Sequence, residues 1–184
     1  MTYRSIKRAA ATLRRGGVIA YPTETVWGLG CDPHNDQAIE KLLALKRRAW
    51  QKGLILIAAD HAQLAPYIQP VARARFKQIR ASWPGPYTWI FPATNHVPQL
   101  VRGQHRTVAV RVTSHPLAAA LCREFGGPIV STSANRSGVA PTRSTWVARR
   151  RYAQQVDYFL DGTAGPHSQP STIRDAATGR IVRR

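Results

Sequence analysis

Short apolar runs alternate with amphipathic segments along most of the chain, and this alternation limits the possible folds more than any other feature of the sequence. The runs that we interpret as buried strands are 18–21, 54–58, 89–91, 108–110 and 129–131. Helices are predicted where apolar residues recur at helical spacing, at 2–15, after Asn35, at about 70–82 and at about 115–125. Strands that alternate with helices are typical of an α/β domain with a largely parallel or mixed sheet.

Length and composition limit the architecture further. With 184 residues, of which 43% are hydrophobic and 20% charged, the chain has the size of one globular domain, to which we assign residues 1–184. Its longest apolar run, 54–59, is much shorter than the roughly 20 residues that span a bilayer. Cys31 and Cys122 are too few for a disulfide framework. We therefore expect a cytoplasmic protein with no membrane segment.

The charge of the chain is strongly unbalanced, since 27 Lys and Arg residues against 9 Asp and Glu residues give a net charge of +18. Such an excess indicates a polyanionic partner or substrate, because like charges repel unless phosphates or counterions offset them. Two basic stripes are predicted on helix surfaces, one of Arg4, Arg8 and Arg15 and one of Arg73, Lys77 and Arg80. These stripes are either an RNA-docking surface or ordinary solvated helix faces.

Several common site motifs are absent. The sequence has no G-x-x-x-x-G-K-[ST] motif, and Gly28-Leu29-Gly30 lacks the third glycine of a dinucleotide-binding turn. A G-x-S-x-G nucleophile elbow is also missing. The six histidines show no metal-ligand spacing, so no metal held by the protein is predicted.

Two polar clusters lie beside the early strands, where open α/β sheets gather ligand groups. In 22–28, the hydroxyls of Thr23 and Thr25 can hold a small polar substrate or can bond their own backbone in a turn. In the segment 46–48, followed by Lys52, an extended backbone would point alternate side chains, 46 and 48, at one group of phosphate oxygens. Alternatively, these cations stabilise the C-terminus of the preceding helix.

A third polar cluster, 131–138, follows the strand at 129–131 and concentrates hydroxyls, an amide and backbone N–H groups. Such a turn can cradle an anion, or it can be a capped connection from a strand to a helix.

The order of the clusters is more specific than any one of them. Along the chain stand Y-P-T-E-T-V-W-G-L-G, K-x-R with K-G-L, V-A-V-R, S-T-S-A-N-x-S-G and P-S-T-I-R-D. From about Gly16 onward this order resembles the YrdC/TsaC family of threonylcarbamoyl-AMP synthases, in its short, single-domain form. The resemblance implies a single domain with an open, twisted, mixed or parallel sheet, flanking helices and a basic concave cleft.

The activity that the resemblance implies is synthesis of L-threonylcarbamoyladenylate from L-threonine, bicarbonate and ATP, with release of pyrophosphate. The product serves N6-threonylcarbamoyladenosine modification of tRNA, so tRNA, bound through the basic surface, and the threonylcarbamoyl transferase machinery are expected partners. Mg²⁺ is expected to be carried by the triphosphate, because the motifs contain few carboxylates to hold it.

The family motifs also imply residue roles. At ATP we expect Lys46, Arg48, Lys52, Thr107, Ser133, Asn135 and Arg183, with Lys46 and Arg48 as the catalytic pair. At threonine we expect Thr25, Arg111, Ser131 and Ser171. Two positions depart from the family pattern: Ala49 stands where many members have proline, and Ile57 where longer members often have histidine.

A hypothesis from another class is a non-catalytic RNA-binding or ribosome-maturation factor. The net charge of +18 and the two basic stripes favour it. Release of pyrophosphate that depends on threonine and bicarbonate would distinguish the enzyme from such a factor.

Overall fold

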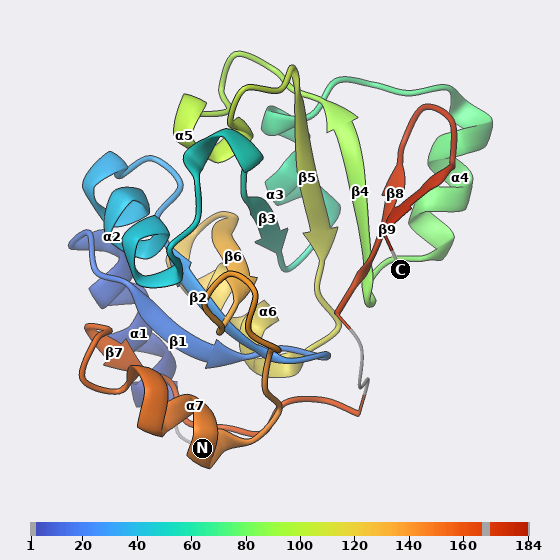
Figure 1. Ribbon diagram of the computed structural model, residues 1–184. Coiled ribbons are helices and arrows are strands. Elements are labelled where there is room, and N and C mark those ends of the chain that lie inside the picture. Colours follow the sequence, from blue (N-terminus) through green and yellow to red (C-terminus); the bar gives the residue numbers. More distant parts are fainter. Residues whose placement is uncertain (1–2, 167–169, 184) are drawn as a thin grey trace.

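A single mixed β-sheet forms the centre of the computed structural model, which describes residues 3–166 and 170–183 (Figure 1). Within these residues nine strands are ordered β7-β1-β2-β6-β3-β5-β4-β8-β9. Their bounds are β1 Ile19–Pro22, β2 Trp27–Cys31, β3 Ile55–Ala58, β4 Tyr87–Pro92, β5 Thr107–Val112, β6 Ile129–Ser133, β7 Tyr158–Phe159, β8 Thr172–Asp175 and β9 Ile181–Arg183. The pairs β1–β7, β3–β5 and β4–β8 are parallel and the other pairs are antiparallel, which confirms the mixed sheet.

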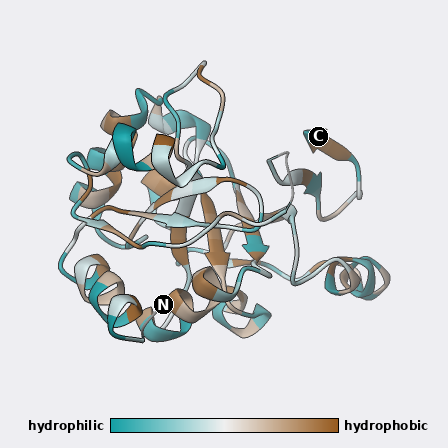
Figure 2. Cartoon of the chain, turned by 90° about the horizontal axis from the view of Figure 1, so that it is seen from below, coloured by the Kyte–Doolittle hydropathy of each residue, from teal (hydrophilic) through white to brown (hydrophobic). Residues whose placement is uncertain are grey.

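Helices pack on both faces of this sheet. Their bounds are α1 Tyr3–Arg14, α2 Asp36–Lys46, α3 His61–Leu64, α4 Arg73–Ala81, α5 Gln99–Arg102, α6 Pro116–Phe125 and α7 Thr145–Tyr152, with short 3₁₀ turns η1 Trp50–Lys52 and η2 Ala65–Tyr67. Apolar residues of α1 and α6 form one core cluster with the sheet, and those of α2, α3, α4 and α5 form a larger one. Figure 2 shows hydrophobic segments in the central strands and helices in which hydrophilic and hydrophobic residues alternate.

The alternation of side chains along the central strands creates the site. In β5, Val108, Val110 and Val112 point into the larger core cluster. Thr107 precedes Val108, and Arg111 lies between Val110 and Val112, so both point to the opposite face. Polar residues on that face mark where the sheet is not covered by an apolar helix.

The predicted elements correspond well to the observed ones, but the short helices α3 and α5 and four strands were not predicted. Each predicted strand and helix overlaps an observed element, and Asn35 Oδ1 caps α2 by accepting a hydrogen bond from the Ala38 amide at 2.9 Å. The third predicted helix, at about 70–82, begins at Arg73 rather than near Pro70 and corresponds to α4. The strands β2, β7, β8 and β9 were not predicted, because β2 contains two glycines and the other three are short or weakly apolar. No helix among the described residues is long and apolar enough to cross a membrane.

Close packing against neighbouring strands explains one glycine of β2, Gly30. A Cβ atom at Gly30 would lie 2.6 Å from the Val130 carbonyl oxygen and 2.9 Å from the Tyr21 ring. Glycine is therefore needed here for close approach of two strands rather than for a turn.

We expect Gly30→Ala to lower the free energy of unfolding by about 1–3 kcal/mol, because the added methyl group pushes β2 away from β6. Urea unfolding followed by circular dichroism measures this. Gly127→Ala is the matched control, since a Cβ atom there meets nothing within 4 Å. A Gly30→Ala protein as stable as the Gly127→Ala protein would show that the two strands separate without cost.

Candidate functional site

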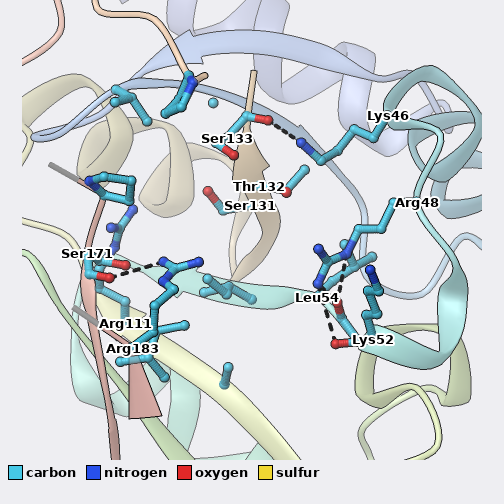
Figure 3. A pocket seen from close by; sticks show the side chains of 18 of the residues that line it. Lys46, Arg48, Lys52, Leu54, Arg111, Ser131, Thr132, Ser133, Ser171 and Arg183 are labelled. Atoms are coloured by element: carbon cyan, nitrogen blue, oxygen red, sulfur yellow. Dashed lines mark hydrogen bonds between the residues drawn. The ribbon is translucent and has the colours of Figure 1, made fainter. Parts of the chain in front are cut away.

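A cleft of about 640 Å³ opens on the face of the sheet to which Thr107 and Arg111 point (Figure 3). The end of α2, the loop through η1, the loop after β6 and the β8–β9 hairpin form its walls. Its polar lining consists of Thr23, Thr25, Lys46, Arg48, Lys52, Arg102, His105, Thr107, Arg111, Ser131, Thr132, Ser133, Asn135, Ser137, Ser171 and Arg183. No carboxylate stands in this lining among the described residues, so the cleft suits an anionic ligand.

The first polar cluster combines both of its possible roles. Thr23 Oγ1 donates to the Val26 carbonyl at 2.8 Å and accepts from the Thr25 amide at 3.3 Å, which makes Thr23 a turn-forming residue. The Thr25 hydroxyl lies 3.2 Å from Thr23 Oγ1, and both threonines line the cleft. The turn thus holds the Thr25 hydroxyl at the cavity wall.

The second cluster converges on the cleft for a reason that differs from the predicted one. The segment is not extended: Lys46 ends α2, and Arg47 caps the helix in the left-handed conformation, with φ 50° and ψ 49°. Arg47 is exposed and lines a separate hollow with Lys41 and Arg136, while Lys46 and Arg48 both line the cleft. The prediction that 46 and 48 share a cavity and 47 faces away is correct, but a helix end produces it.

The Lys46 ammonium is buried between two backbone carbonyl groups. Its Nζ donates to the Ser133 oxygen at 2.5 Å and to the Asn135 oxygen at 2.7 Å, which ties α2 to the loop after β6. Burial and, to a smaller extent, the positive charge of Arg48 together lower the pKa of Lys46 to about 8. One N–H of the ammonium remains for a ligand.

Arg48 is held at the opposite side of the same wall. Its Nη2 donates to the Gly53 carbonyl at 2.8 Å, and its Nε lies 3.3 Å from the same oxygen. Burial lowers the pKa of Arg48, and burial together with the charges of Arg48 and Arg111 lowers the pKa of Arg183. Several cations therefore share the cleft, and an anion placed among them relieves their repulsion.

The third cluster is not a strand-to-helix cap, since the next helix, α7, begins at Thr145 and is capped by Ser144. Asn135 Nδ2 donates to the Arg136 carbonyl at 3.1 Å and to the Val139 carbonyl at 2.5 Å. Its Oδ1 is buried without a hydrogen-bond partner in the described part of the chain. The loop therefore has one unused buried acceptor, on a residue that lines the cleft.

The floor and far wall contain polar pairs that the sequence did not indicate. Tyr21 donates a buried hydrogen bond to Ser131 Oγ at 2.7 Å, and burial raises the pKa of Tyr21. The hydroxyls of Thr88 and Ser171 lie 2.8 Å apart, and Arg183 Nη2 donates to the Ser171 carbonyl at 3.1 Å. Figure 3 accordingly places Arg183 beside Ser171, across the cleft from Arg48.

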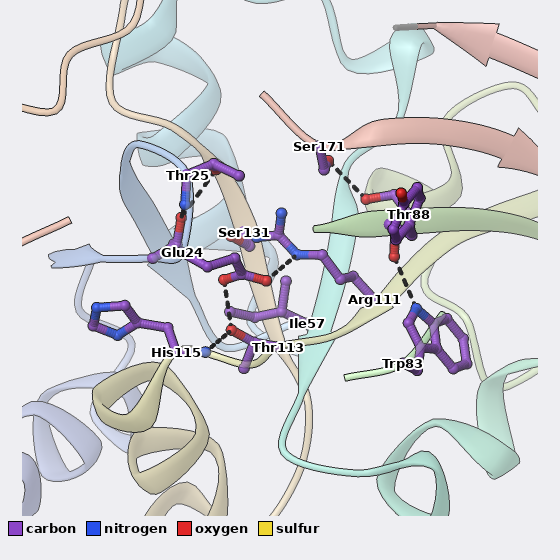
Figure 4. A network of polar contacts seen from close by, with 12 residues as sticks. Glu24, Thr25, Ile57, Trp83, Thr88, Arg111, Thr113, His115, Ser131 and Ser171 are labelled. Atoms are coloured by element: carbon purple, nitrogen blue, oxygen red, sulfur yellow. Dashed lines mark hydrogen bonds and ion pairs between the residues drawn. The ribbon is translucent and has the colours of Figure 1, made fainter. Parts of the chain in front are cut away.

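A buried ion pair lies behind this wall. Arg111 Nε is 3.6 Å from Glu24 Oε1, and Glu24 Oε2 accepts a hydrogen bond from the Thr113 hydroxyl at 2.8 Å (Figure 4). The sequence motifs did not indicate a role for Glu24. Its position between Thr23 and Thr25, in a chain with 9 acidic residues, was the signal that could have found it.

Comparison with known proteins assigns this arrangement to a family. The family model Sua5_yciO_yrdC, described as "Telomere recombination", matches residues 11–184. The chain belongs to the Sua5/YciO/YrdC family. This confirms the resemblance that the order of motifs predicted.

Curated relatives within this family cover nearly the whole chain. A protein of Halorhodospira halophila named threonylcarbamoyl-AMP synthase is 52% identical over 179 residues, which are 97% of this chain and 94% of the relative. A protein of Coxiella burnetii with the same name is 48% identical over 179 residues, 97% of this chain and 96% of the relative.

Solved structures of the family have the same fold. E. coli YciO superposes with a TM-score of 0.89 at 30% identity, with 100% of this chain and 90% of YciO covered. P. abyssi Sua5 complexed with L-threonine gives a TM-score of 0.87 at 30% identity, with 92% of this chain and 50% of that chain covered. The chain thus spans about half the length of this Sua5 chain, and 56% of a P. abyssi Sua5 variant with a TM-score of 0.93.

The residues expected from the family motifs all line the cleft. They are Thr25, Lys46, Arg48, Lys52, Thr107, Arg111, Ser131, Ser133, Asn135, Ser171 and Arg183. Lys46, Arg48 and Lys52 lie on one side, and Arg111, Ser171 and Arg183 on the other (Figure 3). Residues 131–133 lie between the two sides, so the cleft has two cationic ends joined by hydroxyl groups.

The two departures from the family pattern have structural explanations. Ala49 has φ −63° and ψ 131°, angles that proline also adopts, so the loop keeps the backbone of the common family residue. Ile57 is fully buried in the core cluster formed with α1 and α6 and is not a lining residue of the cleft.

No group of three or more His, Cys, Asp or Glu residues that could hold a metal ion occurs in the described ranges. Asp175 Oδ1 accepts hydrogen bonds from the Ala177 and Thr178 amides and thereby closes the turn between β8 and β9.

Replacing Arg48 and Arg47 tests the geometry of the second cluster. We expect Arg48→Ala to weaken ATP binding by about tenfold to a hundredfold, because a charge-assisted hydrogen bond contributes about 1.5–3 kcal/mol. Arg47→Ala, the matched control, should change the affinity by less than about twofold, since its side chain faces away from the cleft. Isothermal titration calorimetry gives both values.

The melting temperatures of the parent and of both variants are measured alongside the titrations. Arg48→Ala loses its hydrogen bonds to Gly53, worth about 1 kcal/mol, and should melt within about 4 °C of the parent. Equal losses of affinity in the two variants would mean that only total charge matters. A loss confined to Arg47→Ala would place the ligand in the neighbouring hollow.

Proposed function

We propose that this chain catalyses ATP-dependent synthesis of L-threonylcarbamoyladenylate from L-threonine, bicarbonate and ATP, with release of pyrophosphate. The observation that carries the proposal is a cleft with two separate cationic ends and no lining carboxylate among the described residues. One end suits a triphosphate and the other a single carboxylate. The names of the curated relatives and the L-threonine complex of P. abyssi Sua5 support this division.

The reaction requires positioning and charge neutralisation rather than a protein nucleophile. The amine of threonine attacks bicarbonate and forms an N-carboxylate with loss of water. An oxygen of this carbamate then attacks the α-phosphorus of ATP, and the bond from the α-phosphorus to the bridging oxygen breaks as pyrophosphate leaves. Negative charge builds on the phosphate oxygens during this transfer, so fixed cations around them lower the barrier.

Each end of the cleft has a role in this scheme. Arg48 and Lys52 neutralise the phosphates, and Lys46 contributes its free N–H while it holds the loop after β6. The remaining nucleotide contacts come from Thr107, Ser133 and Asn135 and, from the opposite side of the cleft, Arg183. Arg111 binds the threonine carboxylate, and the hydroxyl groups that surround the amino acid come from Thr25, Ser131 and Ser171.

Mg²⁺ belongs to the substrate in this scheme. The described residues that line the cleft provide hydroxyl groups and cations but no carboxylate, and such a donor set does not fit a Mg²⁺ ion held by the protein. We therefore propose that the ion arrives on the triphosphate oxygens and keeps its water ligands.

The wider setting follows from the product. A threonylcarbamoyl adenylate is an activated acyl donor, so a transferase that acts on the tRNA adenosine must consume it. We propose that residues 1–184 work as one domain in the cytoplasm, with tRNA and the transferase machinery as partners. The single sheet from β7 to β9 supports the assignment to one domain.

We expect ATP to be cleaved to pyrophosphate and an AMP-containing product only when threonine and bicarbonate are both present, because the carbamate is the attacking group. Serine should be used less efficiently, since it lacks the methyl group of threonine. Pyrophosphate release, measured with each component omitted in turn, checks this. Equal ATP turnover with and without threonine would disprove the proposed function.

RNA binding without catalysis is the second candidate, and one observation favours it. Arg4, Arg8 and Arg15, at α1, and Arg73, Lys77 and Arg80, on α4, are all exposed. Both predicted basic stripes are therefore available to a polyanion. Docking of tRNA on such a stripe is also compatible with the enzyme.

If α4 docks tRNA, joint replacement of Arg73, Lys77 and Arg80 by Glu should weaken tRNA binding, and binding to the parent should fall steeply between about 50 and 200 mM salt. Fluorescence anisotropy with unmodified tRNA measures both effects. The control reverses three exposed arginines of α7, Arg149, Arg150 and Arg151. If the two triple variants lose affinity equally, net charge rather than the α4 stripe determines binding.

A further inference from the structure

Arg111 is a buried cation whose two edges have different surroundings. Its side chain is 6% exposed and that of Glu24 is 4% exposed, and the two groups meet at the Nε edge of the guanidinium. Arg111 Nε and Glu24 Oε1 form no hydrogen bond with each other or with other described residues, so charge alone joins them. The guanidinium thus has an internal carboxylate at its Nε edge, and Arg111 lines the cleft.

Glu24 is itself held from more than one direction. Thr113 Oγ1 donates to its Oε2 at 2.8 Å, and the same Oγ1 accepts from the His115 amide at 3.2 Å. The hydroxyl proton is thus directed at Glu24. Figure 4 shows the contacts of Thr113 with Glu24 and with His115. The Gly165 amide donates to the Thr23 carbonyl at 2.8 Å, and a Cβ atom at Gly165 would lie 2.6 Å from the backbone carbonyl oxygen of Glu24. The backbone around Glu24 is therefore closely packed.

Without an internal counterion, Arg111 would be displaced. Arg183 is close enough to Arg48 and to Arg111 for its charge to interact with both of theirs. Repulsion between these cations favours any arginine rotamer that separates them. A fixed carboxylate at Nε opposes this displacement and leaves the two terminal nitrogens side by side, the edge that binds a carboxylate with two parallel hydrogen bonds.

We propose that Glu24 is a positioning residue that aligns Arg111 for the carboxylate of the amino-acid substrate, and that the Thr113 hydroxyl keeps Glu24 in place. This inference rests on the proposed function, in which threonine binds at Arg111. It adds that selection of an amino acid over an analogue without a carboxylate depends on a residue that is not a lining residue of the cleft.

If Glu24 acted only through its charge, its removal would strengthen threonine binding rather than weaken it. Glu24 is negative, so its removal raises the positive potential at Arg111 and would strengthen binding of any carboxylate. Alignment predicts weaker binding, because a misdirected guanidinium loses the paired hydrogen bonds. The sign of the change therefore separates the two explanations.

The test compares L-threonine with L-threoninol, in which an alcohol replaces the carboxylate. Calorimetric titrations use the parent, Glu24→Gln, and the pair Thr113→Val and Thr113→Ser. Glu40→Gln is the matched control, since Glu40 is an exposed carboxylate of α2 far from this network. ATP is titrated into each variant to confirm that the cleft is intact.

We expect Glu24→Gln to weaken threonine binding by about tenfold or more, while the affinities for threoninol and ATP change by less than about twofold. Thr113→Val should show the same selective loss to a smaller extent, Thr113→Ser should restore threonine binding, and Glu40→Gln should match the parent. In steady-state assays Glu24→Gln should raise the KM for threonine more than it lowers kcat.

Two results would overturn the inference: unchanged or tighter threonine binding by Glu24→Gln, or equal weakening of threonine and threoninol. If Glu24→Gln does not fold, the comparison of Thr113→Val with Thr113→Ser tests the inference instead. Equal affinity of these two variants for threonine would overturn the inference. A parent protein that binds ATP but not threonine would instead refute the proposed function, and the inference with it.

Discussion

The cleft depends on one buried ammonium group. Lys46 ends α2 and donates to the carbonyl oxygens of Ser133 and Asn135, so the helix and the loop after β6 form one wall. Carbonyl dipoles replace water around the charge only in part, and burial therefore lowers the pKa of Lys46 to about 8. The same link places Arg48 and the unused Oδ1 atom of Asn135 at one cavity. A chain that lost it would lose the shape of the nucleotide end.

Arg48, Arg111 and Arg183 each have a partner of their own within the protein. Arg48 is bonded to a backbone carbonyl, Arg111 is paired with Glu24, and Arg183 is bonded to the carbonyl of Ser171. Since each partner is internal, the charges keep their places when no ligand offsets their repulsion. This preorganisation suits a transfer in which the protein stabilises charge on phosphate and supplies no nucleophile. It also accounts for the absence of carboxylates from the described lining of the cleft.

Periodicity in the sequence was sufficient for β1, β3, β4, β5 and β6 and for the longer helices, because each buries an apolar face with a regular repeat. It was insufficient for β2, where two glycines interrupt the apolar pattern and Gly30 allows close approach to a neighbouring strand, and for the short strands β7, β8 and β9. The convergence of positions 46 and 48 was predicted correctly from a wrong local geometry, because the left-handed conformation of Arg47 is not encoded in a pattern of charges.

The sequence by itself determined the α/β class, the excess of positive charge and, through the order of its motifs, which side chains line the cleft. Only the tertiary structure decided their partners: Glu24 for Arg111, Thr88 for Ser171, Tyr21 for Ser131 and the Ser133 carbonyl for Lys46. Each of these pairs joins residues far apart in the chain. Their distances depend on strand register and on how helix ends meet the sheet, and a local repeat of apolar residues carries no information about either.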